Sequence, residues 1–65
     1  MNTYKLDKKD VDYLVSRPES GMGYQIVEVM FSDGSIHKNV KVYNCEMIEL
    51  SEEDGKKKIV YLQVV

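Results

Sequence analysis

Hydrophobic and polar residues alternate most regularly over residues 24–43, on both sides of an Asp33-Gly34 pair. The run 24–31 reads Tyr-Gln-Ile-Val-Glu-Val-Met-Phe, and the run 36–43 reads Ile-His-Lys-Asn-Val-Lys-Val-Tyr. Both are rich in β-branched and aromatic residues, and Asp-Gly between two such runs is the strongest local signal of a β-hairpin. We therefore predict a hairpin with a two-residue type I′ turn, in which Asp33 and Gly34 both adopt positive φ.

This turn also predicts a register, with Phe31 opposite Ile36 near the turn and Tyr24 opposite Tyr43 at the open end. Residues that pair across strands share a face of the sheet. One face is then a predicted core: Val27, Val29, Phe31, Ile36, Val40 and Val42. The other face is mixed and amphipathic: Tyr24, Ile26, Glu28, Met30, His37, Asn39, Lys41 and Tyr43.

Residues 6–17 are the one segment with a helical pattern. Asp7 is a suitable N-cap, because its carboxylate can accept the amides of the first turn. Val11, Leu14 and Val15 fall on one stripe of a helix, which we expect to pack on the sheet. Arg17-Pro18 ends the helix, since the residue before proline avoids the α region. Residues 16–23 then form a loop rich in glycine and serine.

The C-terminal third carries a second Asp-Gly pair, Asp54-Gly55, between candidate strands at 45–50 and 58–65. A two-residue turn there predicts a second hairpin that pairs Leu50 with Ile59. The last strand is apolar on both faces, which is typical of a central strand or an interface. We expect it to pair with a second copy of the chain or with the N-terminal segment.

The fold class predicted from these elements is mainly β: an antiparallel meander of four strands with one short N-terminal helix. Residues 4–6 are a candidate fifth strand. The order of elements, together with the stretches around Asp33-Gly34 and 44–50, resembles small SH3-like and Sm-like β-barrels. That resemblance implies a closed barrel and, for the Sm-like case, an oligomer that binds RNA.

The chain has 65 residues, one cysteine, one histidine and a net charge of −2. A chain this short is expected to form one domain, residues 1–65. A lone cysteine cannot form an internal disulfide, and one cysteine with one histidine is too few for a structural zinc site. The negative charge argues against a general nucleic-acid binder. An unpaired cysteine and the absence of a signal-peptide pattern or a long apolar run favour a cytoplasmic location, with no membrane association.

Catalytic motifs are absent from the sequence, and the sharpest enzymatic idea is a thiolate–imidazole pair between Cys45 and His37. A free cysteine is more often a small buried hydrophobe. We therefore expect a protein that is not an enzyme and that holds no cofactor or metal.

The mixed face of the first hairpin is the candidate binding site: Tyr24, His37, Lys41 and Tyr43. Tyrosine is common in contact surfaces because it offers rigid area together with a hydroxyl group. The leading hypothesis is a protein-interaction or assembly module, which binds a partner through these side chains or through a strand edge that recruits an extended segment. The alternative is an oligomeric Sm-like RNA-binding barrel, with tyrosines stacking on bases and lysines on phosphates. A third interpretation packs Tyr24 and Tyr43 under the helix as ordinary core.

Overall fold

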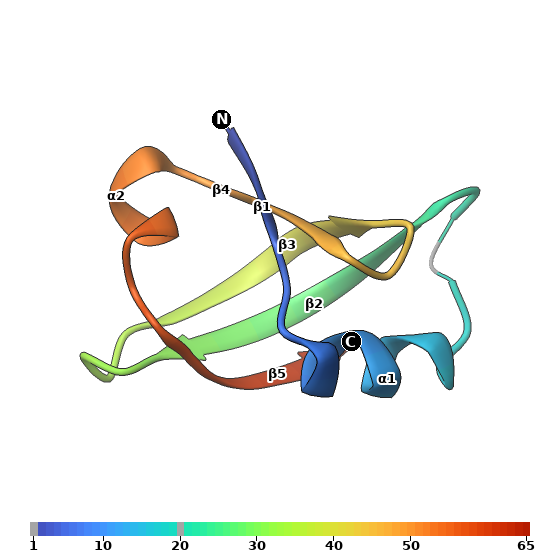
Figure 1. Ribbon diagram of the computed structural model, residues 1–65, viewed down its shortest axis with the longest axis horizontal. Helices are drawn as coiled ribbons and strands as arrows, with labels where there is room; N and C mark the ends of the chain where they lie inside the picture. The colour runs from blue at the N-terminus through green and yellow to red at the C-terminus, as the bar shows by residue number, and fades with distance from the viewer. Residues whose placement is uncertain (1, 20) are drawn as a thin grey trace.

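Five antiparallel strands form one sheet in the computed structural model, which describes residues 2–19 and 21–65 (Figure 1). The elements in chain order are β1 (Asn2–Lys5), α1 (Lys8–Val15), β2 (Tyr24–Phe31), β3 (Ile36–Tyr43), β4 (Met47–Leu50), α2 (Glu52–Gly55) and β5 (Ile59–Val64). The sheet order is β1-β4-β3-β2-β5. The predicted fold class, a mainly β antiparallel meander with a short N-terminal helix, is confirmed, and residues 2–5 supply the fifth strand.

The sheet is open rather than closed into a barrel. Within the described residues, β1 pairs only with β4 and β5 pairs only with β2, so each forms one edge. The C-terminal strand therefore does not pair with the N-terminal segment.

The first hairpin forms with the predicted register at its open end and a different one near its turn. Tyr24 pairs with Tyr43 and Val27 with Val40 as predicted, but Val29 pairs with His37 rather than with Lys38. The turn has three loop residues, 32–34, instead of the predicted two, since the Phe31 amide donates to the Ser35 carbonyl (2.9 Å). Among these loop residues, only Gly34 adopts positive φ (90°). A bulge with Asn39 at φ 59° then restores the register.

The second predicted hairpin is wrong. Ser51 caps the short helix α2 by accepting the Asp54 amide (3.1 Å), and this replaces the expected two-residue turn. Beyond α2 the chain crosses the molecule, and β5 pairs with β2, for example Leu62 with Val29 (Figure 1). β4 pairs with β3 and β1 instead of β5.

Four of the six predicted core residues on the hairpin are buried. Leu6, Leu14, Ile48, Leu50 and Leu62 complete the core. Val40 is only partly buried, and Ile36 is 53% exposed because the shift at the turn moves it to the outer face.

Helix α1 begins after Asp7 as predicted, although the Asp7 side chain makes no capping bond. The predicted stripe is wrong at its last member, since Leu14 is fully buried but Val15 is 68% exposed. Asp10 faces inward instead. The buried Gln25 side chain explains this rotation, because its amide group donates to the carbonyls of Leu14 (3.0 Å) and Arg17 (3.2 Å) and so anchors the helix end to β2.

Candidate functional site

The predicted site residues divide between the two faces of the sheet. Tyr24, Lys41 and Tyr43 lie together on the outer face: the Lys41 ammonium is 5.5 Å from the centre of the Tyr24 ring, and Tyr24 is paired with Tyr43. The Tyr43 hydroxyl donates to Glu49 (3.4 Å). Neither tyrosine belongs to the core or to the residues packed against it, so they do not lie beneath α1 as core.

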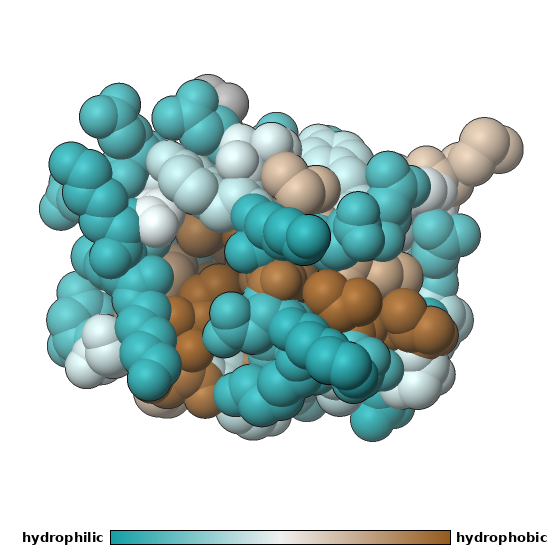
Figure 2. Space-filling view, in the orientation of Figure 1, coloured by the Kyte–Doolittle hydropathy of each residue, from teal (hydrophilic) through white to brown (hydrophobic). Residues whose placement is uncertain are grey.

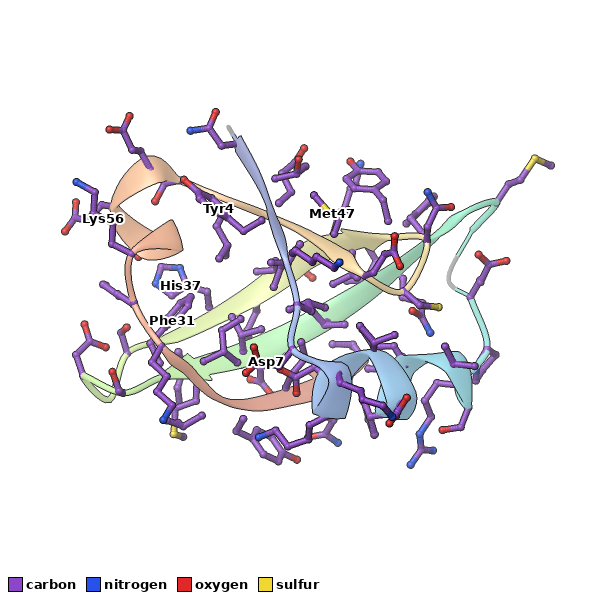
Figure 3. The ribbon with its side chains drawn as sticks, viewed as in Figure 1. Tyr4, Asp7, Phe31, His37, Met47 and Lys56 are labelled. Carbon is purple, nitrogen blue, oxygen red and sulfur yellow. The ribbon has the colours of Figure 1, made fainter. Side chains whose placement is uncertain are left out.

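His37 lies on the inner face, because the longer turn shifts it by one position. Its ring meets the Phe31 ring edge-on at 5.4 Å, and Figure 3 shows the two side chains next to each other. Its Nε2 atom is 3.6 Å from the Asp54 carboxylate. The Cys45 thiol instead donates to the Gln25 side chain (3.4 Å), so the thiolate–imidazole pair between Cys45 and His37, which the sequence allowed, does not form.

A group of charged residues connects the turn at Asp33-Gly34 with helix α2. The Lys57 ammonium lies 3.0 Å from Asp54 and 3.1 Å from Asp33. Hydrogen bonds from the Ser35 hydroxyl and amide, and then from Lys57, hold the pKa of Asp33 well below its usual value. The hydrogen bond from Lys57 lowers the pKa of Asp54, and Asp54 in turn raises that of Lys57. These residues hold α2 against the first hairpin.

A groove lined by residues of helix α1 and of the edge strand β5 lies between these two elements, and we call it the α1–β5 groove. Its volume is about 360 Å³. It is lined by Lys9, Asp10, Tyr13, Arg17, Val60, Tyr61, Leu62 and Gln63. Val60 and Tyr61 are exposed apolar residues of an edge strand.

Backbone groups of β5 point into this groove. The Val65 amide donates to Ile26 on β2 (3.1 Å), and the direction of backbone groups alternates along a strand. The groups of Gln63 therefore face β2, whereas those of Leu62 and Val64 face the groove. The Val64 amide donates to the Tyr13 hydroxyl (3.2 Å), so a side chain of α1 already occupies one backbone position where a neighbouring strand would bind.

Asp10 is the one buried charged residue among residues 2–19 and 21–65, with 8% of its surface exposed. Within that part of the chain its carboxylate has neither a hydrogen-bond donor nor an ion-pair partner. Burial, and to a smaller extent the neighbouring Asp7, raise the pKa of Asp10, while Lys9 acts in the opposite direction.

Asp10 also borders a second cavity of about 180 Å³, the seam cavity, which lies between β1 and the start of β5. Its apolar lining is Leu6, Ile48, Leu50 and Ile59, with Tyr4 at one side. Figure 2 shows apolar surface between hydrophilic rims on this face of the molecule, and Figure 3 shows Tyr4 beside α2 and Asp7 at the start of α1. The seam cavity, between the edge strands β1 and β5, therefore reaches the hydrophobic core.

Three residues that matter for this region were missed by sequence reasoning: Gln25, Asp10 and Tyr13. A signal existed for Gln25, since it lies two positions before Val27 and therefore on the same face as the core. Asp10 lies in the first turn of the helix, where a negative charge is favourable at the surface, so nothing in the sequence indicates that it is buried. Nothing in the pattern places Tyr13 next to β5.

No group of three histidine, cysteine, aspartate or glutamate side chains in the described part of the chain could hold a metal ion. None of its helices is long and apolar enough to span a membrane. No protein-family model, curated protein or solved structure is significantly similar to this chain.

Proposed function

We propose that the protein is a non-enzymatic protein-interaction module, which binds an extended segment of another protein by strand addition at β5. The observation that supports this best is the free edge of β5, which faces the α1–β5 groove with backbone groups of Leu62 directed into it. An edge with unpaired amides and carbonyls is a ready template for another strand.

The groove suits one strand rather than a second folded sheet. Helix α1 stands beside the edge and already bonds to it through Tyr13. A full domain would meet α1 before its own strand reached β5, whereas a single extended segment needs only the width of one strand, about 5 Å. We therefore propose a peptide segment of a different protein, and pairing with a second copy is the alternative outcome.

The outer-face residues are weaker candidates for the same role. The Tyr43 hydroxyl and the Tyr24 ring already have internal partners, Glu49 and Lys41. RNA stacking on Tyr24 and Tyr43 is the alternative function, and the acidic residues Glu28 and Glu49 on that face weaken it. His37 lies on the opposite face of the sheet, so it cannot contact a ligand together with the two tyrosines.

The experiment is selection of binders from a displayed library of random 12-residue peptides, followed by NMR titration of the purified protein with a selected peptide. We expect the Leu62 amide to become protected from exchange and to show the largest shifts, together with Val60 and Tyr61. Val60→Lys should abolish binding, whereas Ile36→Lys, at an exposed apolar position on the outer face, should not.

Three results would contradict the proposal. Shifts confined to Tyr24, Lys41 and Tyr43 would move the binding site to the outer face. Binding of single-stranded RNA that weakens steeply with salt would favour the RNA function. Light scattering that reports a stable dimer with a protected Leu62 amide would identify a second copy as the natural strand donor.

A further inference from the structure

Two cationic side chains, Lys9 and Arg17, line the α1–β5 groove. Lys9 and Tyr13 are four positions apart on one stripe of α1, Arg17 follows two residues beyond the end of the helix, and all three line the groove. The Arg17 guanidinium lies over the Tyr13 ring at 5.1 Å, which places it beside the hydroxyl that bonds to β5. Across residues 2–19 and 21–65, neither Lys9 nor Arg17 forms an ion pair.

The neighbouring Lys8 provides a contrast. It is not among the residues that line the groove, and it pairs at 2.8 Å with Asp12, an exposed residue of the same helix. The helix therefore presents one cation that already has an internal acidic partner and two that do not. The two free cations face the edge where the strand is proposed to bind.

The spacing of these cations matches the repeat of a strand. From Lys9 to Val15 the helix advances about 9 Å, and the 3₁₀-type bonds from the Ser16 and Arg17 amides carry the chain about 4 Å further. Four residues of a strand advance about 13 Å, and side chains four positions apart lie on the same face. An extended segment beside β5 can thus bring one acidic side chain to Lys9 and another, four residues away, to Arg17.

Next to Lys9, the groove also presents a hydrogen-bond acceptor, the Asp10 carboxylate. The Asp10 residue is largely buried and has no hydrogen-bond donor in the described part of the chain, and it borders the groove, where its carboxylate oxygens are still open to solvent. A largely buried carboxylate gains when a donor replaces this limited hydration. The side chain midway between the two acidic residues points to the same face, so a hydroxyl or amide at that position would supply the missing donor.

We propose that the bound segment carries acidic residues at positions i and i+4 and a hydroxyl- or amide-bearing residue at i+2. Lys9 and Arg17 recognise the acidic residues, and Asp10 accepts the hydrogen bond from the middle one. This inference rests on the proposed strand addition at β5 and adds the chemical class of the partner.

The test uses peptides selected from the random 12-residue library. We expect enrichment of aspartate or glutamate at two positions four apart, with serine, threonine, asparagine or glutamine between them. Lys9→Glu and Arg17→Glu should each weaken binding of a selected peptide about tenfold, because reversal replaces attraction with repulsion. Lys8→Glu makes the same charge change outside the groove and is the matched control. Replacing the acidic residue that faces Lys9 by lysine should restore binding to Lys9→Glu.

The two levels of the proposal fail in different ways. If selected peptides protect the Leu62 amide but show no acidic pattern, and Lys9→Glu weakens binding no more than Lys8→Glu, the charge recognition is wrong and strand addition stands. If no peptide protects Leu62, the proposed function itself is wrong. Lys9 and Arg17 are exposed, and Lys9→Gln, which only removes the charge, repeats the test should a reversal variant unfold.

Discussion

Gln25 and Asp10 are the two polar residues that the described part of the fold buries, and they differ in whether their polar atoms have partners. The Gln25 amide group donates to carbonyls at the end of α1, and its oxygen accepts from Cys45. The Asp10 carboxylate has no such partner. One residue therefore stabilises the fold, and the other carries an electrostatic cost until something binds beside it.

Gln25→Met tests the first of these roles. Methionine keeps the length and shape of the side chain but removes the donor, which leaves the carbonyls of Leu14 and Arg17 without their partner. We expect a loss of about 2 kcal/mol in the free energy of unfolding, measured with urea. Gln63→Met, at an exposed position, should change it by less than about 0.5 kcal/mol. Equal effects would show that Gln25 does not anchor the helix.

Asp10→Asn tests the second role through the pH dependence of stability. The pKa of Asp10 is raised in the folded protein, so the folded state holds the proton more tightly than the unfolded state. Its contribution to stability is therefore largest at acid pH and falls as pH rises through the carboxyl range. We expect Asp10→Asn to be more stable than the parent protein at pH 7, with the difference shrinking as pH is lowered toward 3.

Thermal unfolding of both proteins across this pH range measures the difference directly. The carboxyl groups of Asp33 and Asp54 have lowered pKa values and act in the opposite direction, but they are common to both proteins and cancel in the comparison. A variant that is less stable than the parent at pH 7 would indicate an internal donor for Asp10.

Among the elements, the first hairpin could be predicted from the sequence and the second could not. Alternation over 24–43 and an Asp-Gly pair are local signals, and they gave the correct pairing of Tyr24 with Tyr43. The same pair at Asp54-Gly55 forms a helical turn instead, because Ser51 caps it and the Tyr4 ring packs against Gly55. The contact with Tyr4 connects distant parts of the chain, so no local pattern could indicate it.

The candidate site shows the same limit. Placing His37 beside the tyrosines required the turn length to be correct to one residue, because a slip of one moves a side chain to the other face. Which edge of β5 is free depends on the strand with which β5 pairs. The length of the turn and the order of the strands are both determined by packing across the whole molecule, so no single stretch of sequence predicts them.

Gly34→Val tests the element that was predicted best. Gly34 has φ of 90°, and a Cβ atom there would meet no other atom within 4 Å, so the cost comes from the backbone conformation. We expect a loss of about 1–3 kcal/mol in the free energy of unfolding, since a β-branched residue resists positive φ. Ser32→Val, in the same loop, is the control. Unchanged urea unfolding of Gly34→Val would mean that the turn has a different conformation.

At the scale of the whole molecule, the open sheet predicts an alternating pattern of amide exchange along β5. Gln63 and Val65 donate toward β2, Val64 donates to Tyr13, and Leu62 faces the groove. By NMR, the Leu62 amide should exchange faster than that of Gln63 in the free protein. Tyr13→Phe should accelerate exchange at Val64 alone. Uniform protection along β5 would show that another strand already covers the edge.

The bulge in the first hairpin constrains how the chain can vary in length. Near the turn Met30 pairs with Ile36, whereas beyond the bulge Val27 pairs with Val40, so β3 holds one residue more than β2 between these two pairs. Deleting Asn39 with the pairing at the turn kept would therefore turn the side chains from Val40 to Tyr43 to the other face of the sheet, exchanging buried and exposed residues. Losing one residue from the loop leaves these pairs unchanged, so in related chains the loop should vary in length while the length of β3 stays fixed.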